Sequence, residues 1–389
     1  MSGAPARDYV TAREAVALLD VKAATLYSYV SRGLVRVVGT RQGRRYVRDD
    51  VLRLKARRDA RAGHGPVAAG ALRWGEAVLE TRISDVSAGA PRYRGRDAVA
   101  LAESDVAFER VCELLWHDTL PPSAPPWPVE PGAWWAPLRP LTVVGDALDR
   151  VRVGVSVLPG WDAPRAAVRR VASLLGPWDD AHLTACAAEP TVARCTVRAL
   201  AGAVSDEQAT AVNRALVLCA DHELNPSTFA ARVAASAGAD AGACLLAALA
   251  TLTGSRHGRM SDAVERAAAE LTPADVAGRR RRGEAVPGFG HPLYPKGDPR
   301  AASLLRLAEA AGRARWSSLA ALIDAARDAG VEPPSLDVGL AAVRMAFGLP
   351  AGAAAAVFAA GRAAGWIAHA DEQRASGEIL RPRARYVGG

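Results

Sequence analysis

The sequence predicts an all-α body preceded by a small and separate basic domain. Half of the 389 residues are hydrophobic but only 5% are aromatic, and alanine and glycine make up much of the apolar set. Small side chains let helices approach closely, which favours a tightly packed helical body. Charge gives the second indication, because residues 1–62 hold 14 Lys and Arg against 6 Asp and Glu and so account for the whole net charge of +8. A polyanionic partner is therefore expected only at this N-terminal segment.

A linker is expected between the basic segment and the body. Residues 63–71 are small and contain glycine and proline, which is typical of a connection between domains. From residue 72 onward the chain is a succession of helical patterns, with few alternating runs of β-branched residues. The length suits two or three domains in all.

The composition indicates a cytoplasmic protein without membrane contact. The cysteines form no CxxC pair and lie in alanine-rich or leucine-rich contexts, which predicts buried free thiols in a reducing compartment. No apolar run follows the first charges, so no signal peptide is expected. The most apolar stretch, residues 344–362, is too short and too weakly hydrophobic to span a bilayer.

The basic domain is expected to contain helices and a two-stranded wing. Thr11 and Glu14 form a capping box at the start of a helix over 12–19. A second helix begins near Ala24 and ends before Gly33, a natural residue to follow a helix end. The wing is predicted at 34–38 and 44–48, and a final basic helix runs from Asp49 to about Arg58.

This order of elements resembles the winged helix-turn-helix of MerR-type regulators and phage excisionases. The resemblance is carried by Tyr9-Val10-Thr11, by 24–30 (ATLYSYV), by Arg32-Gly33-Leu34 and by Arg44-Arg45-Tyr46. It implies a second helix in the major groove of DNA and wing arginines on phosphates. The groove-facing residues would be Thr25, Ser28 and Tyr29, and the phosphate contacts would be Arg41, Arg44 and Arg45. A basic module that mediates a protein contact remains the alternative.

Three histidines stand out in the body, each at an apparent turn or helix boundary. His222 lies just before Asn225 and Pro226, which predict a helix start, and an anion is favoured at such a positive helix end. His257 follows Gly254, and His291 ends the sequence Pro-Gly-Phe-Gly-His. His369, by contrast, lacks a motif and is expected to be an ordinary helix residue.

The segments around these histidines resemble citrate synthases. The matching segments occur in that family's order and are HELN at 222–225, STFAARV at 227–233, the GxxHG turn at 254–258, PGFGH at 287–291, DPRA at 298–301, and GRAAGWIAHADEQ with RPRARYVG from 361 to 388. The resemblance covers roughly residues 70–389. It implies an all-α, two-domain fold, with a large domain over 72–258 and 349–389 and a small domain over 259–348. It also implies a homodimer with a shared active site.

The resemblance also implies roles for individual residues. Asp337 would take a proton from the acyl methyl group of acetyl-CoA, His257 would hydrogen-bond the thioester oxygen, and His291 would polarise the ketone of oxaloacetate. A carbon acid this weak needs a base and an enolate donor together. The carboxylates of the 2-oxo acid would be held by His222, Arg300, Arg362 and Arg381, with Arg381 serving the neighbouring subunit.

Coenzyme A is the expected cosubstrate, and no permanently bound cofactor or metal is predicted. Gly288 and Gly290 would let the backbone approach the nucleotide, and Lys296 would meet its phosphates. The histidines offer no compact set of metal ligands. The product would be citrate, or a homologue such as 2-methylcitrate if a longer acyl-CoA is used.

One segment departs from the family pattern. Citrate synthases usually show Gly-Pro-Leu-His-Gly-Gly-Ala-Asn around the second histidine, whereas 254–261 read Gly-Ser-Arg-His-Gly-Arg-Met-Ser. The bulkier residues favour an alternative function, a transcription regulator that binds DNA and senses CoA or an oxo acid in a non-catalytic pocket. The side chains that match the family's catalytic and carboxylate-binding residues are all of the expected residue types, which favours the synthase.

Overall fold

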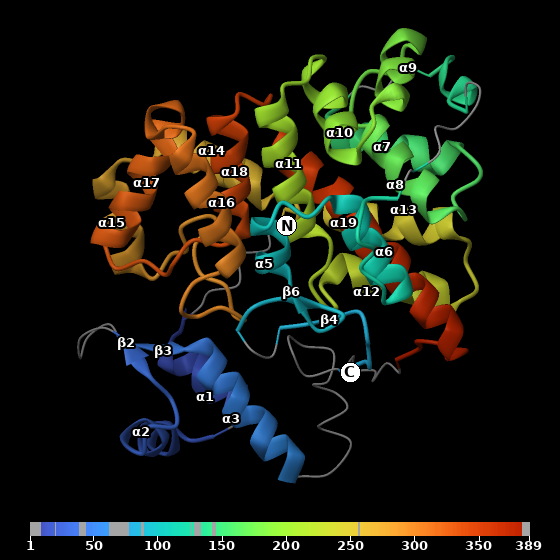
Figure 1. The fold of residues 1–389 in the computed structure, drawn as a ribbon. Coiled ribbons are helices and arrows are strands. Elements are labelled where there is room, and N and C mark those ends of the chain that lie inside the picture. The colour runs from blue at the N-terminus through green and yellow to red at the C-terminus, as the bar shows by residue number, and fades with distance from the viewer. Residues whose placement is uncertain are drawn as a thin grey trace. The chain divides into compact units, whose positions relative to one another are not determined.

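The described residues of the computed structural model form two compact units. The structure describes residues 9–19, 21–38, 44–61, 78–86, 89–125, 127, 134–141, 145–255 and 257–382, with the side chains of 56–61 excepted. The first unit holds the described residues up to Glu80 together with Ala274–Val286, and the second holds Thr81–Pro273 and Pro287–Arg381. Both are dominated by helices (Figure 1).

The N-terminal unit contains the predicted helices and wing. Its elements are β1 (Tyr9–Val10), α1 (Ala12–Leu19), α2 (Ala23–Ser31), β2 (Val37–Val38), β3 (Arg45–Val47) and α3 (Arg48–Arg61). Strand β2 pairs antiparallel with β3, so the two strands predicted there are paired. The sequence did not predict β1, which pairs with the other edge of β3 and makes a three-stranded sheet. The predicted linker at 63–71 lies outside the described residues.

Local signals in this unit behave as the sequence predicts. The Thr11 amide donates to Glu14 Oε2 at 2.7 Å and the Glu14 amide donates to Thr11 Oγ1 at 3.2 Å, so the capping box is present. Gly33 has φ 70°, the left-handed conformation that ends a helix. The small core packs around Val10, Ala15, Leu19, Leu26, Val35, Tyr46, Val51 and Leu54.

The second unit is a helical body with one small sheet. Its first elements are β4 (Ser84–Asp85), β5 (Arg92–Tyr93), β6 (Arg96–Asp97), α5 (Ala98–Glu103), α6 (Phe108–His117), η1 (Ala136–Leu138), α7 (Ala147–Val157), α8 (Pro164–Ser173), α9 (Asp180–Ala188), α10 (Val192–Ala201) and α11 (Asp206–Cys219). The remaining elements are α12 (Pro226–Ser236), α13 (Ala241–Leu252), α14 (Met260–Glu270), α16 (Pro299–Ala310), η2 (Arg313–Trp316), α17 (Ser317–Asp328), α18 (Leu336–Ala346) and α19 (Ala353–Ser376). Helix α15 (Pro273–Arg282) falls almost wholly in the first unit.

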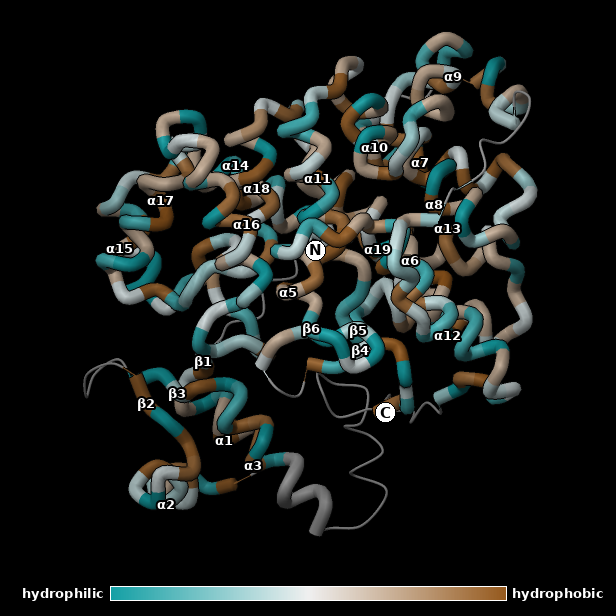
Figure 2. Tube along the Cα trace, viewed as in Figure 1, coloured by the Kyte–Doolittle hydropathy of each residue, from teal (hydrophilic) through white to brown (hydrophobic). Residues whose placement is uncertain are grey.

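The long helix α19 forms the centre of the body. It packs against α11, α12, α13 and α18, and most of its 24 residues are buried. Two glycines allow this contact, since a Cβ at Gly361 would lie 2.8 Å from Leu216 O and one at Gly365 would lie 2.4 Å from Ala220 O. The surrounding helices alternate hydrophobic and hydrophilic residues (Figure 2), as amphipathic helices do.

Two further predictions concern the cysteines and the absence of a membrane-spanning helix. The five cysteines are free and buried, as expected. Among the described residues no helix is long and apolar enough to cross a membrane. The division of the body into a large domain (72–258 and 349–389) and a small one (259–348) stays a prediction.

The close approach of α19 to α11 predicts that a glycine-to-alanine change in a helix will destabilise the protein. Alanine ordinarily stabilises a helix interior over glycine by about 0.5–1 kcal/mol. We expect Gly365→Ala instead to lower the free energy of unfolding by about 1–3 kcal/mol, because its methyl group would be forced against backbone. Urea denaturation measures this. Gly278→Ala in α15 is the control, since its Cβ would meet the flexible ends of Arg282 and Arg281 rather than backbone. A stabilised Gly365→Ala would contradict the packing.

Candidate active site

His222 lies in the turn between α11 and α12 and is fixed by strand β4. Glu223 adopts a left-handed φ of 49°, and its amide donates to Ser84 Oγ at 3.0 Å. As predicted, Asn225 caps α12 and Pro226 begins it. His222 is 7% exposed and its Nε2 bonds Tyr294 Oη at 2.7 Å. Burial first, and then Arg300 and Arg362, hold the pKa of His222 well below its usual range.

His257 lies in the turn between α13 and α14, where Ser227 holds its ring. Its Nε2 is 2.9 Å from Ser227 Oγ, which also accepts the indole N–H of Trp366 at 3.1 Å. Ser227 Oγ also donates to Asn225 Oδ1 at 2.7 Å, so this serine ties the His257 ring to the cap of α12. Burial, assisted by Arg362, lowers the pKa of His257 to about 4, so the ring is neutral near pH 7.

Two glycines join the loop that carries His291 to the segment before α18. Gly288 and Gly290 have φ 80° and 81°, and a Cβ on Gly288 would lie 2.3 Å from Val264 Cγ2. The Gly290 amide donates to Pro333 O at 2.9 Å, and Gly288 O accepts the Ser335 amide at 2.8 Å. The glycines therefore have a packing reason of their own, separate from the approach to a nucleotide that the sequence suggested.

His291 lies beside His222, with 5.6 Å between the ring centroids. Its Nδ1 accepts the Leu293 amide at 3.2 Å, so the neutral ring carries its proton on Nε2 and can donate there. Burial, followed by Arg300, lowers the pKa of His291 to about 4, although Asp298 opposes the shift. A neutral donor at this position suits a carbonyl oxygen.

Asp337 is the one carboxylate of this group whose pKa is raised into the working range. It lies in the first turn of α18 and is partly buried, with Oδ2 3.3 Å from Ser335 Oγ. Burial raises its pKa to about 6, while Arg300 and the Ser335 hydroxyl oppose the shift. At pH 7 the group is mostly ionised yet still basic enough to accept a proton.

The two buried arginines differ in how they are neutralised. Arg300 is 3% exposed and makes a bidentate pair with Asp298, at 3.0 Å from Nε to Oδ1. Arg362 is 1% exposed, donates from Nε to Cys219 O at 2.6 Å and lies over the Phe358 ring. No carboxylate of the described residues forms an ion pair with Arg362, and burial lowers its pKa. A buried cation left in this state favours an anionic ligand.

Two predicted residues lie at the surface, away from these groups. Lys296 is exposed in the loop that leads to α16. Arg381 is exposed as well, one residue after Leu380, whose amide donates to Ser236 Oγ at 3.1 Å at the far end of α12 from Ser227. The rise along α12 separates these two serines by about 14 Å. Within one chain, therefore, Arg381 is not brought to the arginine and histidine cluster.

Sequence reasoning missed several residues that support the site. Tyr294 touches both His222 and His291, and Ser227 holds His257. His369 is fully buried with Nε2 3.1 Å from Asp221 Oδ2, rather than being an unremarkable helix residue. The available signals were a tyrosine within the PGFGH-to-DPRA segment and an aspartate directly before His222.

The N-terminal unit requires one correction among its predicted DNA contacts. Ser28 is exposed on α2 and Arg44 is exposed beside β3, while Thr25 and Arg45 are half-buried. Tyr29 packs against the small core, so it does not face outward as predicted. Tyr27, which is 50% exposed, occupies the outward position instead. Arg41 lies outside the described residues.

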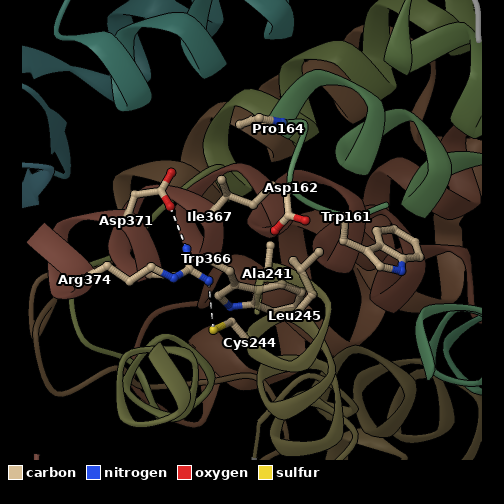
Figure 3. Close-up of a pocket in the computed structure, with 11 residues that line it drawn as sticks. Trp161, Asp162, Pro164, Ala241, Cys244, Leu245, Trp366, Ile367, Asp371 and Arg374 are labelled. Carbon is tan, nitrogen blue, oxygen red and sulfur yellow. Dashed lines mark hydrogen bonds and ion pairs between the residues drawn. The ribbon is translucent and has the colours of Figure 1, made fainter. Parts of the chain in front are cut away.

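A separate hollow of about 240 Å³ is lined in part by residues 366–374 of α19 (Figure 3). Trp161 and Trp366 line it, and Asp162, Asp371 and Arg374 stand at its rim. It contains none of the histidines, nor Asp337 or the two buried arginines. Its one link to the cluster is Trp366, which bonds Ser227. No group of three or more potential metal ligands was found in the described part of the chain.

The part of the chain that holds this cluster matches a known protein family. The family model for the citrate synthase C-terminal domain matches residues 167–383. A citrate synthase of Haloferax volcanii is 30% identical, over 81% of this chain and 94% of that relative. The chain belongs to the citrate synthase family. A 2-methylcitrate synthase of Shewanella oneidensis is 29% identical over 81% of this chain and 93% of its own length.

The fold agrees with this membership. The solved citrate synthase of Thermoplasma acidophilum, a ternary complex with carboxymethyl coenzyme A and oxaloacetate, superposes with a TM-score of 0.67 at 23% identity, covering 81% of this chain and 95% of that one.

The raised pKa of Asp337 predicts that this side chain destabilises the fold. Its folded pKa of about 6 exceeds the ordinary 3.8, so the cost is absent below about pH 4, grows as the pH rises through 6 and is complete above it. We expect Asp337→Asn to stabilise the protein by roughly 2–3 kcal/mol at pH 8 and by almost nothing at pH 4. Urea denaturation at both pH values measures this, with the exposed Asp162→Asn as control. An equal gain at the two pH values would contradict the burial of Asp337.

Proposed function

We propose that this chain condenses a short acyl-CoA with oxaloacetate and releases CoA. The observation that carries the proposal is the set of protonation states in the cluster. One carboxylate has its pKa raised to about 6, and two histidines are kept neutral with pKa values of about 4. Enolisation of a thioester needs this combination of a base and uncharged hydrogen-bond donors.

In the proposed reaction Asp337 takes a proton from the carbon beside the thioester. The electron pair of that C–H bond moves into the enolate, whose oxygen accepts a hydrogen bond from His257. The enolate carbon then attacks the ketone carbon of oxaloacetate. The ketone oxygen takes a proton through His291, and the proton that Asp337 removed replaces it. Water finally cleaves the C–S bond of the thioester, leaving a carboxylate, the CoA thiol and a released proton.

The substrate carboxylates are assigned to the buried cations. Arg362 has no carboxylate partner among the described residues, and Arg300 keeps N–H groups beyond those bound to Asp298. The planar guanidinium suits bidentate recognition of a carboxylate. His222 completes this group from the α11–α12 turn. We assign Arg381 to the site of a second copy, which makes the active unit a homodimer.

Coenzyme A is assigned to the surface beside the His291 loop. Lys296 is exposed there and available to a phosphate, and Gly288 and Gly290 shape the loop. The proposed enzyme holds no permanent cofactor. Relatives include proteins described as citrate synthases and as 2-methylcitrate synthases, so acetyl-CoA and propionyl-CoA are both substrates to test.

Release of CoA thiol tests the activity directly. Purified protein given oxaloacetate with acetyl-CoA or propionyl-CoA should release thiol, and Asp337→Ala should slow release by about 10²–10⁴-fold. The rate should fall as the pH drops through about 6, where Asp337 gains its proton. Asp328→Ala, which removes an exposed carboxylate of α17, is the control. Absence of thiol release from the wild-type protein with both acyl-CoA substrates would refute the synthase.

A second activity is proposed for the N-terminal unit. We infer that it is a winged helix-turn-helix module that binds DNA, because two helices, a paired wing and a third helix follow one another around a shared core. The segment also holds the whole net positive charge of the chain. Tyr27 and Ser28 lie on the exposed side of α2, and Arg44 lies exposed beside the wing strand β3.

Salt dependence of DNA binding tests this module in the full-length protein. Each phosphate contact contributes a slope of about −0.9 to the plot of log affinity against log salt. We expect Arg44→Ala with Arg45→Ala to weaken binding to a 30-bp duplex, a length of roughly three helical turns, and to reduce the slope by about 2. Arg13→Ala, on the exposed side of α1, should have little effect. Absence of binding by the wild-type protein at low salt would refute the module's proposed role.

A further inference from the structure

Arg259 lies two residues after His257 and faces three carboxylates. Its Nη1 forms a close ion pair with Asp146 and lies 3.6 Å from Asp262, and its Nη2 lies 3.9 Å from Asp149. Asp146 and Asp149 belong to the start of α7, whereas Asp262 is in the first turn of α14. Arg259 is therefore the charged link between the turn that carries His257 and a helix far away in the sequence.

The turn itself is short and is held mainly at its ends. The His257 amide donates to Gly254 O at 3.0 Å, and the Gly258 amide donates to Leu252 O at 2.9 Å. A Cβ on Gly258 would lie 2.5 Å from Leu252 Cδ1, so the backbone is pressed against the end of α13. On one side Ser227 fixes the imidazole ring. On the other side the anchor is Arg259, so a shift of Arg259 would move the backbone beside His257.

Asp146 is suited to hold this arginine because its two oxygens have separate tasks. Oδ1 accepts the amides of Leu148 and Asp149 and caps α7, while Oδ2 binds Arg259. The cap fixes the carboxylate independently of the ion pair. Burial opposes ionisation of Asp146, yet the bond to Arg259 outweighs it and the pKa of Asp146 is lowered. The pair is thus ionised throughout the neutral range.

We propose that Arg259 is a positioning residue that, through Asp146, sets the place of His257 against the thioester oxygen. This inference rests on the proposed function and deepens it. It also gives a physical reason for the departure from the small residues of the family pattern, since the bulky side chain is directed to α7. A donor displaced by a fraction of an ångström would stabilise the enol less while leaving the binding of oxaloacetate unchanged.

The test removes the charge of Arg259 in the full-length enzyme and follows the enolisation step. We expect Arg259→Gln to lower kcat by roughly 10- to 100-fold, with the KM for oxaloacetate within about twofold of wild type. The kinetic isotope effect on kcat with trideuteroacetyl-CoA should rise, because breaking the C–H bond becomes more limiting. A general loss of folded protein would lower the apparent rate without changing that isotope effect.

A second variant separates the ion pair from folding. Asp146→Asn keeps an oxygen for the α7 cap and replaces the oxygen that binds Arg259 by an NH2 donor, so it should fold and reproduce the kinetic effect of Arg259→Gln. The two changes together should cost no more than either one alone. Arg266→Gln, which changes an exposed arginine of α14, is the matched control.

The outcomes are distinguishable from failure of the proposed function. A wild-type enzyme that releases no thiol refutes the synthase itself. An active wild-type enzyme whose Arg259→Gln and Asp146→Asn variants keep both kcat and the isotope effect overturns the positioning role alone. Additive losses in the double variant would also overturn it, because they would mean that the residues act separately.

Discussion

The site depends on burying Arg362 in the middle of a packed helix, where no carboxylate of the described residues forms an ion pair with it. Gly361 and Gly365 bring α19 against the end of α11, and there Cys219 O accepts the Arg362 Nε proton. The same approach places the α11–α12 turn, and with it His222, beside this arginine. A larger residue at either glycine would separate α19 from α11 and remove the cation from the histidines. The close packing of α19 against α11 and the proposed recognition of an anion by Arg362 therefore depend on the same two glycines.

A second constraint is concentrated in Asp298. It caps α16, pairs with Arg300 through both oxygens, and accepts the Leu336 amide at 3.1 Å. Leu336 directly precedes Asp337, so one buried carboxylate fixes both an anion-binding arginine and the proposed base. Gly288 and Gly290 add backbone bonds between the His291 loop and the same segment. The side chains of His291, Arg300 and Asp337 are thereby held in fixed positions relative to one another.

The features that the sequence predicted correctly depend on interactions between residues close together in the chain. Thr11 with Glu14, and Asn225 with Pro226, fix helix starts through bonds within a few residues. The roles of the motif histidines and arginines were implied by the resemblance to citrate synthases, which short ordered motifs carry. The Asp221–His369 pair joins residues 148 apart, and no local pattern announces such a contact. Tyr29 was placed outward because helical period alone did not decide which of two nearby tyrosines meets the core.

Burial of the charged and titratable groups of the site favours its chemistry at the expense of stability. Water would solvate Arg362, ionise Asp337 more readily and let the histidines take protons, and each change would weaken enolisation. The body excludes water with small residues, so its core can close around polar groups at short range. The cost is an ionised carboxylate and, as far as the described part of the chain shows, a cation without an ion-pair partner inside the protein. Such costs persist in a fold only when the surrounding packing fixes them, and here α19 and Asp298 do so.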